Sequence, residues 1–498
     1  MKFRINLILL LFGFAIITSC DLQEKPHGFY SEDNFFQTAE DAESGLMYAY
    51  DALTFLEYSR GIFWLGEAPS EAVSVKADEG PDVVSLSQWQ IDGYPTNSVL
   101  ENYFQYAYIA INRSNAVIEQ VPQGDFDQSL KDKYLGEAYF LRAFNYFNLV
   151  RHFGNVPIHE STVSTVSDTE ASMSADIDEV YDLIISDLEQ AINLLSIDPM
   201  LGRADKVAAQ SLLAKVYITI ASAKENDVPL YTDMEKDVDQ MYSNAAQYSG
   251  EVVNNQSAYG FDDDLMNIYD IENPRGPEHI FLMSMDRTGE VEGDYSKIGK
   301  LFIPYIDGAT IYLENNDGTY TPSHDGFSSL QTNSSFYNSF EDDDRRKTDL
   351  MVDSVYNENG QLTAEYPGSI LYPFTRKYID PNFIGDKEST KPYLIRYTDV
   401  ALIYAEAVGP TTEGYQTVNY VRNRAGLGNL QPGLGTDEFR RAIIQERAYE
   451  LAFEGNRMFD LKRYNLVNDI VPAASNLSDE EVTFYPIPQT ELDLNEGI

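Results

Sequence analysis

The chain contains a single cysteine, Cys20, so its 498 residues cannot form an internal disulfide or a set of thiolate metal ligands. Histidine is almost as scarce, and the five that occur do not cluster along the sequence, which argues against a catalytic transition-metal centre. They are His27, His152, His159, His279 and His324. We expect no cofactor, although the many acidic residues leave open a calcium ion with a structural or ligand-assisting role.

Basic residues are also few. The chain has 35 Lys and Arg against 80 Asp and Glu, a formal net charge of −45. A field of this sign repels phosphate backbones, so the composition excludes nucleic acid as a partner. The phosphate-binding loop and the nucleophile elbow of serine hydrolases are absent as well. Glycoside hydrolysis needs only two suitably placed carboxylates, and 80 acids leave that activity open.

Long hydrophobic runs are missing too, apart from one at the N-terminus. Lys2 and Arg4 precede an apolar run at 5–17, which is too short for a comfortable membrane span but has the charge layout of a secretory signal. Small residues then stand directly before Cys20, as in a bacterial lipobox. This layout predicts a signal peptide at 1–19 and a lipid on Cys20.

The residues after the cysteine predict a protein that is anchored and does not span the membrane. Residues 20–34 contain proline and glycine and are expected to form a tether. No later apolar run approaches the length of a membrane span. Several acyl chains on one cysteine would hold the protein firmly, because each buried methylene contributes roughly 0.8 kcal/mol.

The folded body is predicted to be mainly α-helical, in two parts that meet near residue 258. In the N-terminal part, 35–258, apolar residues recur at helical spacing, and Thr38 is placed to cap the first helix. Helices are expected at 39–56, 99–120, 130–152, 175–195, 206–223 and 237–253.

The C-terminal part, 259–498, begins differently. Between 259 and 392 turn-forming residues are frequent and apolar runs are short, which predicts loops with a few short strands, one of them at 280–285. So long an irregular stretch is more often a binding surface than a simple connection. Helices return at 397–408, 414–425 and 437–453, the last with Thr436 as its N-cap.

Three of the expected helices share small residues and tyrosines at helical spacing, at 136–143, 209–217 and 404–407. Small residues let neighbouring helices approach closely, and tyrosines fill the grooves between them. This combination is typical of tetratricopeptide-like helical hairpins. The sequence therefore predicts a scaffold of such hairpins with a loop-rich, short-strand face for the ligand.

A series of longer motifs runs through the same chain. They are GEAYFLRAFNYFNLVRHFGNVPI (136–158), AAQSLLAKVYI (208–218), EDDDRR (341–346), RYTDVALIYAEA (396–407), NYVRNRAGL (419–427), IIQERAYELAFEGNRMFDLKRY (443–464) and YPIPQTELDLN (485–495). In content and order the set resembles the SusD/RagB family of outer-membrane nutrient-binding lipoproteins.

The resemblance implies a function as well as a fold. It implies a surface-exposed lipoprotein of the outer membrane that captures oligosaccharide or polysaccharide and delivers it, without catalysis, to a SusC-like TonB-dependent transporter. A peptide-capturing, RagB-like subunit is the first alternative, and a surface glycoside hydrolase is the second. The charged residues of the motifs have the spacing of buried ion pairs that fix helix register. These are Arg142, Arg447, Glu450, Glu454 and Arg457.

Eight aromatic residues are the candidate glycan contacts, because starch-binding relatives grip sugar with an aromatic arc. The matching regions hold Trp64, Trp89, Tyr94, Phe104, Tyr295, Tyr305, Tyr312 and Tyr320. A flat ring stacked on a pyranose buries apolar area and leaves the hydroxyls free. The two tryptophans flank 67–88, which has no clean periodicity and is expected to be a loop on the ligand side. Phe104 stands where many relatives have tryptophan, a departure from the starch-binding pattern.

The lipid anchor is directly testable. Cys20→Ala should release the protein from the membrane fraction or leave an unprocessed precursor, because the thioether that carries the lipid can no longer form. Fractionation and mass spectrometry of the N-terminus measure both outcomes. A correctly processed mutant that stays in the membrane would contradict the anchor.

Overall fold

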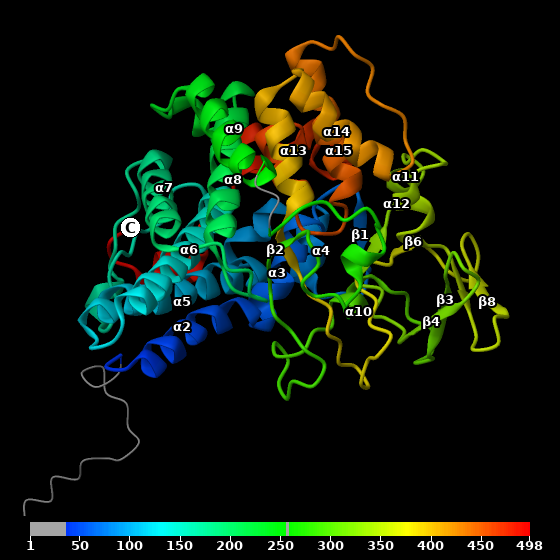
Figure 1. The fold of residues 1–498 in the computed structure, drawn as a ribbon, viewed down its shortest axis with the longest axis horizontal. Helices are drawn as coiled ribbons and strands as arrows, with labels where there is room; N and C mark the ends of the chain where they lie inside the picture. Colours follow the sequence, from blue (N-terminus) through cyan, green and yellow to red (C-terminus); the bar gives the residue numbers. More distant parts are fainter. Residues whose placement is uncertain (1–35, 255–257) are drawn as a thin grey trace, which may run out of the picture.

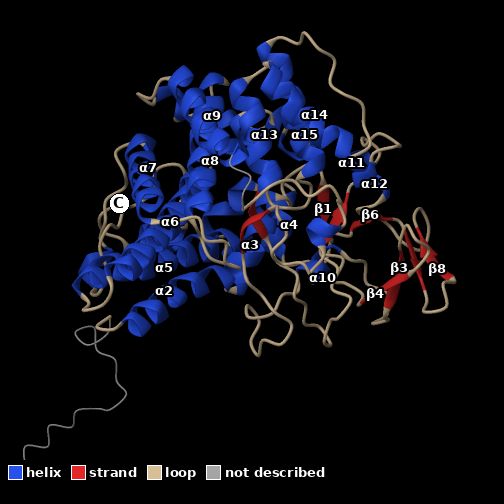
Figure 2. Ribbon diagram, in the orientation of Figure 1, coloured by secondary structure: helices blue, strands red, loops and turns tan. Residues whose placement is uncertain are grey.

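The computed structural model describes residues 36–254 and 258–498. The expected signal peptide, the tether and Cys20 lie outside these ranges and stay predictions. Within the described ranges no helix is both long and apolar enough to cross a membrane. The predicted fold class is confirmed, because helices dominate the structure and the strands are short (Figure 2).

Every helix predicted before residue 258 is present, with ends within two residues of the expected ones. The helices of this part are α2 (Ala39–Thr54), α3 (Leu56–Gly66), α4 (Pro81–Ser87), α5 (Ser98–Gln120), α6 (Gln128–Phe153), α7 (Ile177–Leu194), α8 (Lys206–Glu225) and α9 (Val238–Asn254). Each helix from α5 to α8 packs against the next, and α2 packs against α5 and α6, which produces a row of helical hairpins (Figure 1).

Local capping explains why these helices begin where they do. The Thr38 side chain accepts from Asp41 N, and the Asp41 side chain accepts from Thr38 N, so the predicted cap of α2 is confirmed as a capping box. Asn97 caps α5 by accepting from Val99 N and Leu100 N. Such caps satisfy backbone donors that the helix itself leaves unpaired.

Helices α6 and α8 form the centre of the first half. Every residue of α6 from Phe140 to Phe153 is buried, and α8 is buried nearly all round. A helix that is enclosed on all sides must accept close neighbours, which is why small residues recur in it. At Gly136, for example, an added Cβ would lie 2.7 Å from the Leu195 side chain.

The second half contains most of the strands, all but the last of them in the predicted irregular region. These are β2 (His279–Leu282), β3 (Ile311–Glu314), β4 (Tyr320–Ser323), β5 (Leu330–Thr332), β6 (Met351–Val352), β7 (Ser354–Tyr356), β8 (Leu362–Glu365), β9 (Phe374–Thr375) and β10 (Tyr393–Arg396). Antiparallel pairing in the order β4-β3-β7-β8 forms the sheet on the right of Figure 1. Strand β2 confirms the prediction at 280–285, although it is shorter.

Helices dominate again after residue 396. Three short helices precede them, α10 (Ile298–Phe302), α11 (Ser334–Tyr337) and α12 (Arg345–Thr348). The C-terminal helices are α13 (Tyr397–Val408), α14 (Thr412–Arg424), α15 (Thr436–Glu450), α16 (Arg457–Arg463), α17 (Val467–Ile470), α18 (Asp479–Thr483) and α19 (Gln489–Leu494). Thr436 was expected to cap α15, but it is the first helical residue and Gly435 is the cap.

A network of buried ion pairs holds the second half together. Arg396 contacts Glu278 at 2.8 Å, Glu450 at 3.1 Å and Glu454 at 2.8 Å. Arg424 pairs with Glu278 and Glu450 as well. Burial opposes ionisation of Glu450, but the surrounding arginines outweigh it and hold the pKa of this carboxyl below its usual range. The expected structural role of the motif charges is confirmed for Glu450 and Glu454.

Both tryptophans lie in the interior, so the expectation that they are surface aromatics flanking a loop on the ligand side is wrong. Trp64 lies on α3 in the main core, and Trp89 packs with Met458 and Leu461 of α16. The Trp89 Nε1 donates to Pro69 O at 2.9 Å. The intervening segment is partly regular, because it contains α4 and strand β1 (Val73–Val75), which pairs with β5. Long-range pairing and packing override its weak local periodicity.

Removing the central arginine should weaken the fold strongly. Arg396→Met leaves three buried carboxylates without their shared cation, which is expected to lower the free energy of unfolding by about 3–5 kcal/mol. The matched control is Lys76→Met, because Lys76 pairs with Asp78 on the surface and should change stability by less than about 1 kcal/mol. Urea denaturation of both variants measures the difference, and equal midpoints would contradict the role of the network.

Trp89→Ala should behave as a core substitution. Loss of its buried indole is expected to cost about 3–5 kcal/mol of folding stability. Tyr305→Ala serves as the control, since Tyr305 is 64% exposed and its removal should leave the melting temperature unchanged. A Trp89→Ala protein that melts like the wild type would overturn this assignment.

Candidate ligand-binding site

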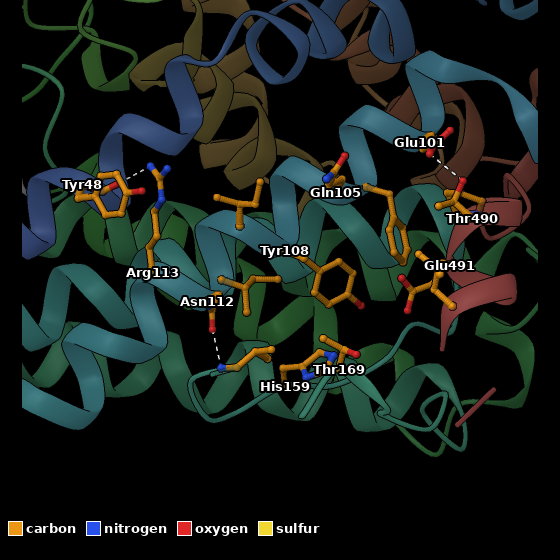
Figure 3. Close-up of a pocket in the computed structure, with 16 residues that line it drawn as sticks. Tyr48, Glu101, Gln105, Tyr108, Asn112, Arg113, His159, Thr169, Thr490 and Glu491 are labelled. Carbon is orange, nitrogen blue, oxygen red and sulfur yellow. Dashed lines mark hydrogen bonds between the residues drawn. The ribbon is translucent and has the colours of Figure 1, made fainter. Parts of the chain in front are cut away.

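A groove of about 660 Å³ runs along one side of α5 and is open to solvent. The 159–169 segment after α6 forms a wall beside α5, and the C-terminal helix α19 closes one end (Figure 3). Sixteen residues line it: Tyr48, Glu101, Phe104, Gln105, Tyr108, Ile109, Ile111, Asn112, Arg113, His159, Val163, Thr169, Pro488, Thr490, Glu491 and Leu494.

The contribution of α5 follows from helical geometry. Seven of its lining residues recur at steps of three and four from Glu101 to Arg113, so they form one stripe along the helix. The twelve residue steps between these two positions correspond to about 18 Å of helix. The remaining faces of α5 pack against α2, α3 and α6, which fixes the direction in which the stripe points.

An aromatic pair occupies the middle of the stripe. The rings of Phe104 and Tyr108 lie 4.8 Å apart, and Phe104 also meets the edge of Phe153 at 5.2 Å. The Tyr108 hydroxyl donates to Pro157 O at 2.6 Å. Phe104 is almost fully buried and supports Tyr108, which is held by this bond and offers a fixed, partly exposed ring to a ligand.

The 159–169 segment is fastened to α5 by hydrogen bonds. Asn112 Oδ1 accepts from Val163 N at 2.7 Å, a contact drawn in Figure 3. Asn115 Nδ2 donates to His159 O and Ser161 O, each at 2.9 Å. Burial lowers the pKa of His159, so its imidazole is neutral at neutral pH. This wall therefore presents fixed, uncharged polar groups.

Charged residues stand at the two ends of the groove. At one end the Arg113 guanidinium lies 3.4 Å from the centre of the Tyr48 ring and donates to Asp51 at 3.1 Å. Tyr48 itself is 58% exposed. At the other end Thr490 donates to Glu101 at 2.7 Å and ties α19 to α5, with Glu491 beside them (Figure 3).

This arrangement suits non-covalent binding of a long, polar ligand. Apolar rings line the centre, and donors and acceptors are distributed along the walls, as in pockets that orient a ligand by a few polar contacts. Across residues 36–254 and 258–498 no group of three or more His, Cys, Asp or Glu side chains is placed to hold a metal ion.

Of the eight predicted aromatics, Phe104 alone lines this groove. Tyr94 is buried and, like the two tryptophans, belongs to the core. Tyr312 and Tyr320 lie half-buried on β3 and β4, where Tyr320 contacts Tyr356 with ring centres 5.2 Å apart. Tyr295 is half-buried beside Lys387, and Tyr305 is exposed.

The sequence of α5 carries a signal for the groove. The stripe on α5 is a regular series of aromatic, amide and charged residues, in a helix whose other positions are mostly apolar or small. Tyr48 and the lining residues of α19 gave no such signal, because they reach the groove only through tertiary packing.

Comparisons with known proteins agree with the fold and the motifs. A model described as the SusD family matches residues 350–498, and a model described as starch-binding, associating with the outer membrane, matches residues 67–218. Together the two segments span more than half of the chain.

Individual relatives extend this similarity over nearly the whole chain. SusD-like protein P2 of Formosa agariphila is 27% identical over 100% of this chain and 98% of its own length. A SusD homolog from Bacteroides thetaiotaomicron has the same fold, with a TM-score of 0.75 at 22% identity, over 94% of this chain and 97% of that one. A laminarin-binding SusD-like protein gives a TM-score of 0.73 at 23% identity, over 92% and 99%.

The motif series, the two family models and the shared fold all lead to one assignment. The chain belongs to the SusD/RagB family.

Proposed function

We propose that the protein captures oligosaccharide or polysaccharide in the groove along α5 and delivers it to a SusC-like TonB-dependent transporter in the outer membrane. The observation that carries the proposal is the stripe of rings and polar groups on α5, which faces an open groove of about 660 Å³. A structurally similar protein binds laminarin, which supports a glycan as the ligand.

The chemistry of the groove suits a sugar chain. The partly exposed ring of Tyr108 can cover the apolar C–H face of a pyranose unit, and the buried ring of Phe104 packs behind it. Gln105, Asn112 and His159 then face the hydroxyls, which both donate and accept hydrogen bonds. Glu101 and Glu491, together with the net charge of −45, favour a neutral glycan over a sulfated or uronic one.

The cellular role in this proposal rests on the N-terminal motif and on the family. A lipid on Cys20 would keep the protein at the outer surface of the outer membrane, beside its transporter. Membership of the SusD/RagB family supports that partnership. Capture needs no cofactor in this scheme, so chelation of divalent ions should leave glycan binding unchanged.

Two other functions are compatible with parts of this groove. A peptide would also fit an open groove with rings and mixed polar groups, and a peptide-capturing subunit is the alternative within the family. Glu101 and Glu491 place two carboxylates at one end of the groove, which is the observation that favours a glycoside hydrolase. We favour binding alone, because related proteins are known as glycan binders.

The groove can be tested with two matched variants. Tyr48 lines the groove and Tyr305 does not, although both are exposed tyrosines. After a glycan array identifies a ligand, Tyr48→Ala should weaken binding by about 1–3 kcal/mol, or roughly 5- to 150-fold in Kd, through lost ring contact. Tyr305→Ala should bind normally. Isothermal titration calorimetry measures both.

Loss of binding in Tyr305→Ala but not in Tyr48→Ala would show that the groove along α5 is not the binding site. It would place the ligand on the loop region instead. An array without any glycan ligand, followed by binding of peptides, would favour the peptide alternative. Incubation with the best glycan should release no new reducing ends. Steady release that Glu101→Gln or Glu491→Gln abolishes would establish a hydrolase.

A further inference from the structure

Arg151, near the end of α6, is buried without a carboxylate partner. Each of the other buried arginines among the described residues forms an ion pair within 4.0 Å, but Arg151 forms none. Its Nε donates to Phe147 O at 3.1 Å and its Nη2 donates to Asn148 Oδ1 at 2.6 Å. Nη1 makes no hydrogen bond to any described residue. The guanidinium is enclosed by two rings, with Phe147 at 3.9 Å and Phe459 at 3.6 Å.

A second buried cation lies in the same part of the core. Lys462 of α16 is 6% exposed, and its Nζ has no hydrogen-bond partner among the described residues. Its nearest aromatic contact is the Tyr485 ring, at 4.4 Å. Burial and then the charge of Arg151 lower the pKa of Lys462 to about 7. The Nδ1 of His152, next to Arg151, is also buried and without a partner.

A small, partly open cavity adjoins these groups. It has a volume of about 40 Å³, and its lining includes Arg151, His152, Asn148, Lys215 and the Phe459 ring. One water needs roughly 10–15 Å³ by this kind of measure, so the cavity can hold a monatomic ion. Its size excludes a sugar or any larger organic ligand.

The remaining charges around the cavity are already balanced. Lys215 donates to Asp399 and Asn456, each at 2.8 Å. Glu454, which also lines the cavity, is held by Arg396 at 2.8 Å and Lys377 at 2.6 Å. Arg151 therefore keeps an uncompensated positive charge, in a protein whose net charge is −45.

An isolated charge in a protein interior is strongly unfavourable unless it is paired and hydrogen-bonded. A water molecule would complete the hydrogen bonds of Arg151 but would leave its charge unbalanced. A small anion does both. We propose that the cavity beside Arg151 binds chloride, held by Arg151 Nη1. The ion would act as a counter-ion to Arg151 between the end of α6 and Phe459 of α16, which also lines the cavity.

The site can be located with bromide, which replaces chloride and scatters anomalously. Crystals of the wild-type protein soaked in sodium bromide should give an anomalous peak inside the cavity, within hydrogen-bond distance of Arg151. In solution, the melting temperature should rise by several degrees and saturate with sodium chloride, as expected for a ligand that binds only the folded state. Sodium methanesulfonate at equal ionic strength should not reproduce the rise, because its anion is too large.

Two variants complete the test. Arg151→Met keeps a long apolar side chain between the two phenylalanines and should abolish the chloride-dependent rise. Lys391→Met is the control, since Lys391 is also buried without an ion pair but does not line the cavity, and it should keep the rise. If Arg151→Met does not fold, the bromide experiment on the wild type still decides. No anomalous peak in the cavity, with equal melting temperatures in the two salts, would overturn the proposal.

Discussion

Buried charges must be neutralised by neighbours, and in this protein that requirement fixes how the second half is assembled. Glu450 ends α15, and Glu454 follows about one turn later. Arg396 of β10 forms ion pairs with both carboxylates, and Arg424 of α14 forms one with Glu450. Arg346 of α12 pairs with Glu446 and Glu450. These cations come from different segments of the chain. No segment can therefore move alone without leaving a charge unpaired in a medium of low polarity.

The need to neutralise buried charges also explains where the excess of acidic residues lies. Most buried basic residues are paired with acids inside the protein, so the large excess of acidic residues is left to the surface. A surface of that sign keeps the protein soluble and repels anionic polymers. Arg151 is an exception, because no carboxylate of the described residues lies within 4.0 Å of its guanidinium although the chain has many.

The groove depends on the helical scaffold more than on the loops. Caps at Asn97 and Asp127 set the starts of α5 and α6, and packing of α5 against its neighbours leaves one stripe uncovered. The walls then come from remote segments, the 159–169 segment through Asn112 and α19 through Glu101. A rigid helix with pinned walls keeps its lining side chains in place before a ligand arrives, which lowers the entropy lost on binding.

Local signals in the amino-acid order were sufficient for the helical framework. The bounds of α13 agree with the prediction at both ends, and the capping box at Thr38 could be anticipated from its neighbours, because caps and apolar periodicity act over a few residues. The motif series likewise pointed to the family.

Which side chains are buried could not be predicted in the same way. Trp89 packs against residues of α16 and the segments after it, and Thr490 meets Glu101 across 389 residues of sequence. Whether a ring is exposed, and which helices border a groove, depends on neighbours distant in sequence, so only the tertiary structure could decide it.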